Sequence, residues 1–306
     1  MSRSANLTSR SLDVTRSLKV WLSAFRLRTL PLATASIMLG SFLAAADDAF
    51  RWQVALLCFA TAILLQILSN LANDYGDTVH GADSSARVGP KRATQSGQIS
   101  KAAMRRALWL FVGLSLGVGY LLVRGESIFY YLLGLAAIAA AIAYTAGPRP
   151  YGYAGLGDLF VLVFFGMVGV LGTYYLHTHR LDWTVLLPAL SCGFFCVAVL
   201  NINNLRDLES DRRAGKYTIP VRLGGRRARL YHWFLLLTGL ACATAYAVLN
   251  FRSPVQFLFL ASVPLLLENG RRVWQQRDAA ELDPQLRQMA LTTLLFSLTF
   301  GLGSVL

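Results

Sequence analysis

The sequence predicts an all-α integral membrane protein with nine transmembrane helices. Hydrophobic residues make up 55% of the 306 positions and charged residues only 15%, whereas soluble domains carry about 25% charged residues. Many apolar runs approach the roughly 20 residues that a helix needs to cross a bilayer. Lipid cannot satisfy backbone polar groups, so helices are expected in these runs. The short alternating segments of a membrane β-barrel are absent from the sequence.

The apolar runs place the nine spans along the chain. They cover residues 29–47, 52–74, 104–123, 127–146, 155–177, 183–205, 231–250, 254–270 and 288–306. The eighth span is the weakest, because Pro264 and Glu268 interrupt a short apolar run. Residues 1–28 are polar and basic. We therefore expect a basic N-terminal segment over 1–28, followed by a single transmembrane domain over 29–306.

The distribution of positive charge predicts the orientation of these spans. The chain has a net charge of +13 from 29 Lys and Arg residues. All but four of them lie on one side of the predicted membrane, and the exceptions are Arg51, Arg124, Arg180 and Arg252. Loops rich in Lys and Arg stay in the cytoplasm. The N-terminus is therefore expected to be cytoplasmic and the C-terminus to lie outside. The basic excess is explained by topology and anionic lipid, without nucleic acid.

The second span ends in a polar cluster within LLQILSNLANDYGDTVHGAD. Gln66, Asn70, Asn73 and Asp77 recur at helical spacing, so they share one face that ends at the cytoplasmic mouth. Gly76 and Gly81 are expected to end the helix. Polar side chains at membrane depth are costly and therefore indicate function.

A second cluster closes the sixth span in LNINNLRDLESDRRAGK. Asn203, Asp207 and Asp211 recur every four residues and are expected to share a face. Four spans separate the two clusters, so both emerge on the same side of the membrane whatever the orientation of the protein.

The two clusters together predict a magnesium site. Carboxylates that converge repel one another, and a hard divalent cation relieves that repulsion. Mg²⁺ takes one or two protein carboxylates and completes its shell with water and substrate phosphate. Basic residues flank both clusters, so the site suits a metal-bridged anion such as diphosphate. The alternative is a pair of ordinary solvated, mixed-charge loops.

At these residues the sequence resembles the UbiA-type family of membrane prenyltransferases. The similarity extends from RLRTLPLA (26–33) through LLQILSNLANDYGD, RPYGYAGLGD (149–158) and NINNLRDLESDRRAGKYTIPVRLG (201–224) to the last spans. It implies a nine-helix bundle with a cytoplasm-facing cavity in a bacterial inner membrane. These segments are most similar to family members that use 1,4-dihydroxy-2-naphthoate. The implied reaction transfers a polyprenyl group from polyprenyl diphosphate to that acid, with loss of CO2 and diphosphate, giving demethylmenaquinone.

The resemblance also implies roles for residues of the two motifs. Mg²⁺ would be held by Asp77, Asp83, Asp207 and Asp211, and Asn73 and Asn203 would orient these carboxylates or ligate directly. Many family members carry an Asp at the position of Gly81, so the ligand set of the first motif stays open between Asp83 and Asp74. The expected contacts to diphosphate are Arg87, Lys91, Arg206 and Lys216.

The aromatic acid is expected to bind beside this head group. Arg26, Arg28 and Arg149 are candidates for its carboxylate, because guanidinium binds carboxylate in a bidentate manner. Arg26 and Arg28 equally fit simple positive-inside anchoring. The other expected members of the aromatic-substrate site are Tyr144, Tyr151, Asp158, Gln66 and Asn70. The tyrosines equally fit an interfacial aromatic belt.

Two other functions are compatible with parts of this pattern. A family member could use another acceptor, such as 4-hydroxybenzoate. A transporter or cation channel could also carry acidic residues, although transporters place their sites near the midplane and these acids lie at one face. Gly113 and Gly117 form a GxxxG motif, which alone does not define an oligomer.

Overall fold

The computed structural model describes residues 17–81, 89 and 92–306 of the chain. Within these ranges every regular element is a helix, as expected for the all-α class. In chain order they are η1 (Leu27–Thr29), α2 (Leu30–Ala46), α3 (Trp52–Val79), α4 (Lys101–Leu122), α5 (Ile128–Ala143), α6 (Gly157–Val161), η2 (Leu162–Gly172), α7 (Thr173–Thr178), η3 (Trp183–Val185), α8 (Leu186–Arg206), α9 (Leu208–Arg213), α10 (Ile219–Leu223), α11 (Gly225–Leu249), η4 (Pro254–Ser262), α12 (Val263–Gln275) and α13 (Leu282–Val305).

Seven helical segments in the described ranges are long and apolar enough to cross a membrane. They are Ser17–Ala46, Trp52–Val79, Lys101–Leu122, Gly157–Thr178, Trp183–Arg206, Gly225–Leu249 and Leu282–Val305. Helix α5 is apolar but only 16 residues long. The expected eighth span is helical over Pro254–Gln275 but is not among the seven. It changes from a 3-10 helix to an α-helix at Val263, beside the Pro264 that was expected to weaken it.

The fifth span is continuous, but its helix changes type along its length. Residues Leu162–Gly172 form a π-helix between two short α-helical ends. π-helical turns are rare and occur often at functional sites. Here the widened segment borders the cavity that is described below.

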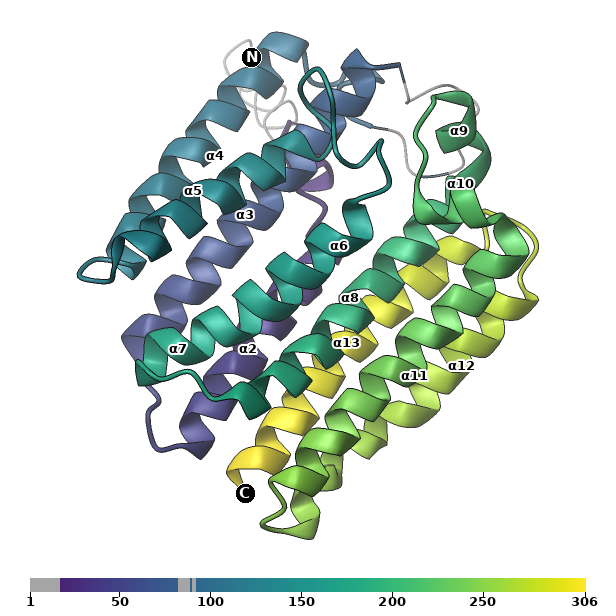
Figure 1. Cartoon of the computed structure of the whole chain (residues 1–306). Helices are drawn as coiled ribbons and strands as arrows, with labels where there is room; N and C mark the ends of the chain where they lie inside the picture. Colours follow the sequence, from purple (N-terminus) through teal and green to yellow (C-terminus); the bar gives the residue numbers. More distant parts are fainter. Residues whose placement is uncertain (1–16, 82–88, 90–91) are drawn as a thin grey trace, which may run out of the picture.

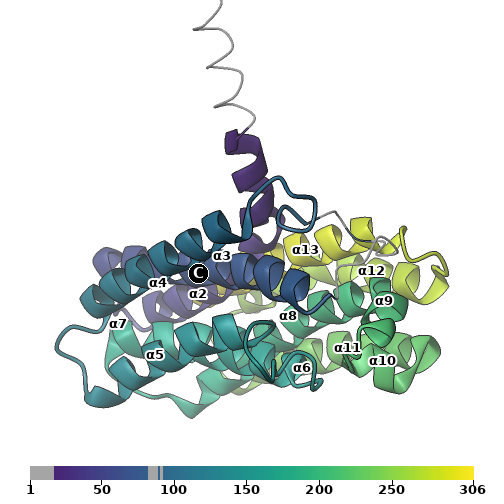
Figure 2. The ribbon, with the colours of Figure 1, turned by 90° about the horizontal axis from the view of Figure 1, so that it is seen from above.

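Helix α8 lies at the centre of one half of the bundle and packs against α11, α13 and η2. Helix α2 connects the halves, because it packs against α13, η2 and α3 (Figure 1). In the other half, α3 packs against α4 and α5. The largest apolar core gathers around α8 and includes Phe195, Phe296 and Phe300. Residues 17–25 project from the bundle (Figure 2).

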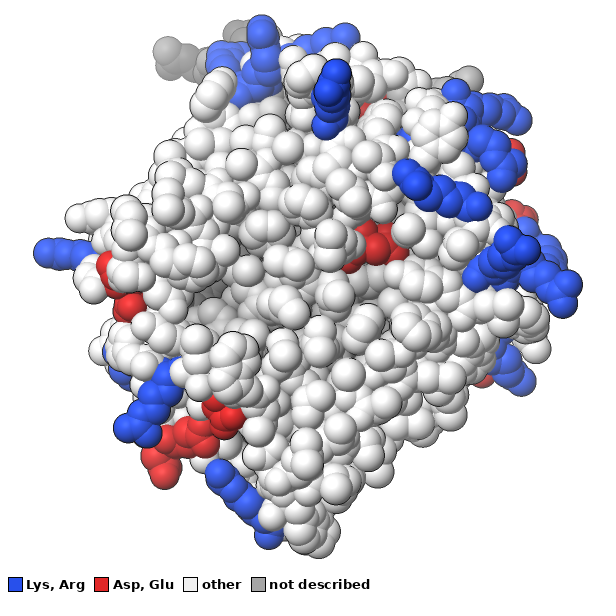
Figure 3. Space-filling model, viewed as in Figure 1, with Lys and Arg blue, Asp and Glu red and all other residues white. Residues whose placement is uncertain are grey.

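Charged side chains mark the two ends of the molecule. On the face shown in Figure 3 they gather along the edges, and a broad band with little charge lies between them. Such a band fits the hydrocarbon layer of a bilayer. Helices α9 and α10 lie at the end of the bundle opposite the C-terminus (Figure 1).

Candidate active site

The first motif ends α3 and presents Asp77 to a polar pocket. Its side chain is buried and its carboxylate accepts hydrogen bonds from Arg92 Nη2 at 2.5 Å and from the Tyr153 hydroxyl at 3.1 Å. Burial, followed by the charge of Asp77, raises the pKa of Tyr153, so this hydroxyl stays a neutral donor. Asp77 is thus a buried carboxylate that accepts hydrogen bonds from a guanidinium and a phenol.

Gly76 does not end the helix, which continues to Val79, so the sequence-based expectation for this glycine was wrong. The position instead allows close packing. A β-carbon at Gly76 would lie 2.5 Å from the Thr145 carbonyl oxygen, so only glycine fits there. Thr145 in turn donates to the Asn73 side chain at 2.9 Å, which orients that amide. The expected end at Gly81 agrees with its positive φ of 71°.

Asp74 points to a different environment from Asp77. Its two oxygens accept hydrogen bonds from the backbone N–H groups of Ala93 and Thr94, each at 3.0 Å. This carboxylate anchors the segment after the first motif and does not border the cavity. The other expected residues of that segment, Asp83, Arg87 and Lys91, lie outside the described residues.

The second motif is interrupted where the sequence predicted one continuous helical face. Helix α8 ends at Arg206, Asp207 follows as a cap, and α9 begins at Leu208. The Arg206 guanidinium donates to both oxygens of Asp207, at 3.0 and 2.8 Å. It also donates to Asn203 Oδ1 at 2.9 Å. Arg206 therefore organises two of the expected ligand residues.

Lys216 brings the two motifs together. Its Nζ atom lies 4.0 Å from Asp77 Oδ2 and 3.8 Å from Asp211 Oδ1. The same atom lies over the rings of Tyr144 and Tyr153, 5.9 and 5.6 Å from their centroids. Burial lowers the pKa of Lys216, but the charges of Asp77 and Asp211 outweigh burial and raise it above its ordinary value. Lys216 is therefore a buried cation shared by both motifs.

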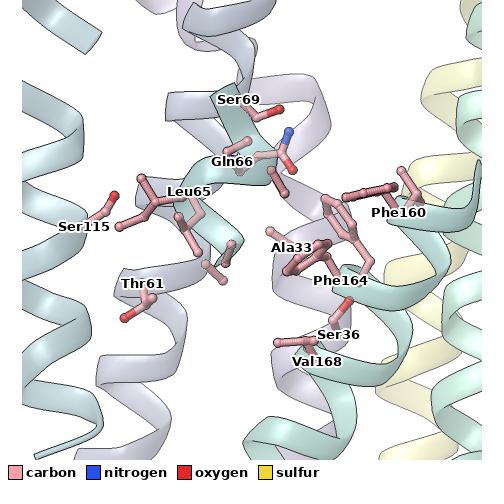
Figure 4. A pocket seen from close by; sticks show the side chains of 18 of the residues that line it. Ala33, Ser36, Thr61, Leu65, Gln66, Ser69, Ser115, Phe160, Phe164 and Val168 are labelled. Carbon is pink, nitrogen blue, oxygen red and sulfur yellow. The ribbon is translucent and has the colours of Figure 1, made fainter. Parts of the chain in front are cut away.

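A cavity of about 640 Å³ opens from this charged cluster into the bundle. Its polar end includes Asn73, Asp77, Asn203, Lys216 and Arg92. The rest is mostly apolar: Phe160, Phe164 and Val168 border one side, opposite Thr61 and Leu65 of α3 (Figure 4). The surface is hollowed between α5 and the α6–α7 segment, within the band of little charge (Figure 3). The cavity thus has one charged end, and the rest of its lining is mostly apolar.

A second group of polar side chains borders the cavity near the start of α2. Asn70 Nδ2 donates to the Phe25 carbonyl at 2.9 Å and to Thr29 Oγ1 at 3.1 Å. Gln66 Nε2 donates to Thr29 Oγ1 at 3.3 Å, whereas Gln66 Oε1 is buried and has no hydrogen-bond partner among the described residues. Arg26 also borders the cavity and adopts a left-handed backbone conformation. These residues offer both donors and an acceptor to a polar ligand.

The remaining expected acceptor residues fall into two groups. Tyr144 and Tyr151 border the cavity, and Tyr151 stacks on Phe160 with centroids 3.9 Å apart. Arg28, Arg149 and Asp158 do not border it. Arg28 pairs with Asp283 at 2.9 Å, and Asp158 accepts from Tyr231 at 3.0 Å. Arg149 is exposed at the surface.

The oxygen donors at the charged end of the cavity suit magnesium. Within the part of the chain that the structure describes, no three His, Cys, Asp or Glu side chains gather closely enough to hold a metal alone. Mg²⁺ does not require such a cage, since substrate phosphate and water supply most of its ligands. Asp77 and Asp211 flank one cation, and the amides of Asn73 and Asn203 border the same cavity. These hard oxygen donors fit Mg²⁺.

Comparisons with known proteins give the relatives of this chain. The model of the UbiA prenyltransferase family matches residues 33–294. The chain is 46% identical to a 1,4-dihydroxy-2-naphthoate octaprenyltransferase of Haemophilus influenzae, over 95% of this chain and 97% of that protein. It is also 46% identical to the octaprenyltransferase with the same acceptor from Escherichia coli, over 93% and 94% of the two chains.

Solved structures share the fold at low sequence identity. A UbiA homologue from Aeropyrum pernix has a TM-score of 0.69 at 16% identity, covering 91% of this chain and 97% of that one. A UbiA homologue from Archaeoglobus fulgidus bound to GPP and Mg²⁺ has a TM-score of 0.65 at 16% identity, covering 94% and 99%.

Proposed function

Because the chain belongs to the UbiA prenyltransferase family, we propose that it transfers a polyprenyl group from polyprenyl diphosphate to 1,4-dihydroxy-2-naphthoate. The products are CO2, diphosphate and demethylmenaquinone at its hydroquinone level. The observation that carries this proposal is the position of Lys216 between Asp77 and Asp211, at the charged end of an apolar cavity. The 46% identity to octaprenyltransferases of this type, over nearly the full length of both chains, supports the choice of acceptor.

The charged end would bind the diphosphate head group. Asp77, Asp207 and Asp211, with the amides of Asn73 and Asn203, would hold Mg²⁺, and Asp83 is proposed as a further ligand. When bound, Mg²⁺ neutralises the negative charge that develops on the leaving diphosphate. Lys216 and Arg206 supply fixed positive charge at the same place, and Arg87 and Lys91 are proposed as further contacts.

The apolar part of the cavity would hold the prenyl chain. Its hollow lies in the band with little charge, so a chain longer than the cavity could extend into lipid. Burial of a hydrocarbon chain is favourable by roughly 0.8 kcal/mol per CH2 group. Binding energy from this remote part of the donor would position its diphosphate end beside Lys216.

The acceptor would lie between the charged end and the start of α2. Arg26, which borders the cavity, would bind its carboxylate, and Gln66 and Asn70 would bind its hydroxyl groups. The ring carbon that bears the carboxylate attacks the allylic carbon of the donor, a C–C bond forms, and diphosphate leaves with the electron pair of the broken C–O bond. Loss of CO2 returns electrons to the ring and restores its aromaticity. The ring faces of Tyr144 and Tyr151 would stabilise positive charge on the allylic group.

The protein would be a multi-pass protein of a bacterial inner membrane with its site on the cytoplasmic side. The apolar helices and the family support the membrane location. The excess of Lys and Arg beside both motifs supports the orientation. The N-terminus would then be cytoplasmic and the C-terminus would lie outside.

The test is prenyl transfer by the purified protein in detergent. Octaprenyl diphosphate and 1,4-dihydroxy-2-naphthoate labelled in its carboxyl group should yield prenylated quinol and labelled CO2 in equal amounts. EDTA should abolish both, and added Mg²⁺ should restore them. Equal or faster transfer to 4-hydroxybenzoate would reject the proposed acceptor. Absence of transfer to either acid would reject the proposed reaction.

A further inference from the structure

Asp283, in the first turn of α13, contacts two arginines from distant parts of the chain. Its Oδ1 atom accepts a hydrogen bond from Arg206 Nη1 at 2.6 Å. Both of its oxygens lie close to Arg28 Nη1, at 3.1 and 2.9 Å. The contact to Arg206 is among the shortest charge-assisted hydrogen bonds in the molecule, and such bonds are stronger than neutral ones.

Arg206 divides its guanidinium between Asp283 and the second motif. Nη1 faces Asp283, whereas Nε and Nη2 bind the two oxygens of Asp207, and Nη2 also binds Asn203. The planar guanidinium fixes these directions relative to one another. The position of Asp207 and Asn203 therefore depends on how the opposite edge of Arg206 is held.

We propose that Asp283 is a positioning residue for the diphosphate site, acting through Arg206 on Asp207 and Asn203. This inference rests on the proposed function, because it assigns those two residues to the magnesium diphosphate head group. Asp283 itself does not border the cavity. Groups that orient metal ligands from behind typically change metal affinity or activity by about 10–100-fold when they are removed.

The charge balance explains why a second carboxylate is needed behind Arg206. The Arg206 side chain is only 1% exposed and lies against Asp207, whose side chain is 5% exposed. The ion pair with this guanidinium offsets part of the charge of the carboxylate that should bind metal. Asp283 shares the positive charge of Arg206 from the other side, which leaves more of the negative charge of Asp207 available to a cation.

A purely structural role for Asp283 makes different predictions. In that role, the ion pair between Arg28 and Asp283 would only stabilise the packing of α13 against η1. However, both side chains are about one third exposed, at 31% and 37%. Solvent-exposed ion pairs of this kind contribute little to stability. Loss of Asp283 should therefore affect binding more than folding.

The test compares Asp283→Asn with Glu281→Gln, which removes the same charge two residues earlier from an exposed side chain that makes no cap hydrogen bond. Titration calorimetry of the full-length protein in detergent measures binding of inorganic diphosphate in the presence of Mg²⁺. Asp283→Asn should weaken binding about tenfold and raise the KM for polyprenyl diphosphate. The loss of Tm should be small because Arg206 keeps its ion pair with Asp207, and the KM for the aromatic acid should stay near that of the unchanged protein. Asp283→Glu should recover part of the binding, and Glu281→Gln should bind normally.

Two results would overturn the inference. One is normal binding of magnesium diphosphate by Asp283→Asn. The other is a lowered Tm with reduced kcat and an unchanged KM for the donor, which would make the residue a structural tie. Should Asp283→Asn fail to fold, two variants that retain the carboxylate behind Arg206 decide. Arg28→Gln should bind nearly normally, and Asp283→Glu should bind less tightly than the unchanged protein because its longer side chain shifts that carboxylate. Weak binding by Arg28→Gln would then count against the inference. Calorimetry needs no turnover, so failure of prenyl transfer in the unchanged protein would be seen separately.

Discussion

The ammonium nitrogen of Lys216 lies 4.0 Å from Oδ2 of Asp77, so the loop after the second motif reaches directly to the first. The same nitrogen lies 3.8 Å from Asp211. Two acidic segments that are far apart in the sequence thus share one cation inside the protein. The charged end of the cavity is therefore a single site to which both motifs contribute, and single substitutions can test it.

Replacement of Lys216 by Met should make folding depend on magnesium. Removal of one partner from a buried ion pair costs about 3–5 kcal/mol, and this is an upper limit here because Asp77 retains Arg92. We expect a lowered Tm in EDTA and partial recovery with Mg²⁺, which replaces the lost positive charge. Thermal unfolding in detergent measures both. Lys101→Met, at an exposed position, is the control, and an equal Tm loss with and without Mg²⁺ would contradict this account.

Asp77 and Asp74 should respond differently to the same change, although they lie three residues apart. Asp77→Asn removes the carboxylate charge that Arg92 and Lys216 share, so it should lower Tm and also reduce turnover per folded molecule at least about a hundredfold. Asp74→Asn leaves a backbone donor of Ala93 or Thr94 without its acceptor, at a cost of about 1–3 kcal/mol. Its main effect should be a lowered Tm. Rates per folded molecule and unfolding curves of both variants decide, and equal losses of rate would refute the distinction.

Gly119→Phe should make prenyl transfer depend on the length of the prenyl donor. Gly119 borders the cavity, and a β-carbon there would enter open space. It lies 15 residues along α4, or about 22 Å at the helical rise, from Met104, which shares an apolar cluster with Leu71 and Ala93 beside the first motif. A geranyl chain should not reach it, whereas an octaprenyl chain should.

We therefore expect kcat/KM for octaprenyl diphosphate to fall at least about tenfold relative to geranyl diphosphate. Competition between the two donors measures this ratio. Leu121→Phe changes an exposed residue that does not border the cavity and should leave the ratio unchanged. A similar loss for both donors would show that the chain takes another path.

Gly76→Ala should destabilise the protein because its methyl group would meet backbone atoms of Thr145 and Ala146. Overpacking of this kind costs about 1–3 kcal/mol. The control is Gly117→Ala, where a β-carbon meets no atom within 4 Å and the higher helix propensity of alanine favours the variant. Unfolding temperatures should move in opposite directions, and an unchanged Tm for Gly76→Ala would contradict the packing described here.

Helical periodicity accounts for what the sequence could predict of the site. Gln66, Asn70, Asn73 and Asp77 all border one cavity, as their spacing requires. The parity of the spans correctly placed both motifs at the same end. Such a pattern can be predicted because the spacing within one helix alone determines which side chains share a face.

Other parts of the site depend on contacts that no local pattern contains. The helix breaks at Asp207, whose carboxylate accepts hydrogen bonds from the preceding Arg206. The spacing of the acidic residues does not indicate this break. Asp283 reaches the site only because α13 packs beside α8. The one available signal was an acidic residue opening the last apolar span. The role of Gly76 likewise depends on the separate segment around Thr145.

The position of α13 has a consequence for biosynthesis. This helix leaves the ribosome after every other described helix, yet it packs against α2, which is among the first to enter the translocon. A nascent chain that lacks it has inserted both acidic motifs but has no carboxylate behind Arg206. Full affinity for magnesium diphosphate should therefore arise only when α13 has been synthesised.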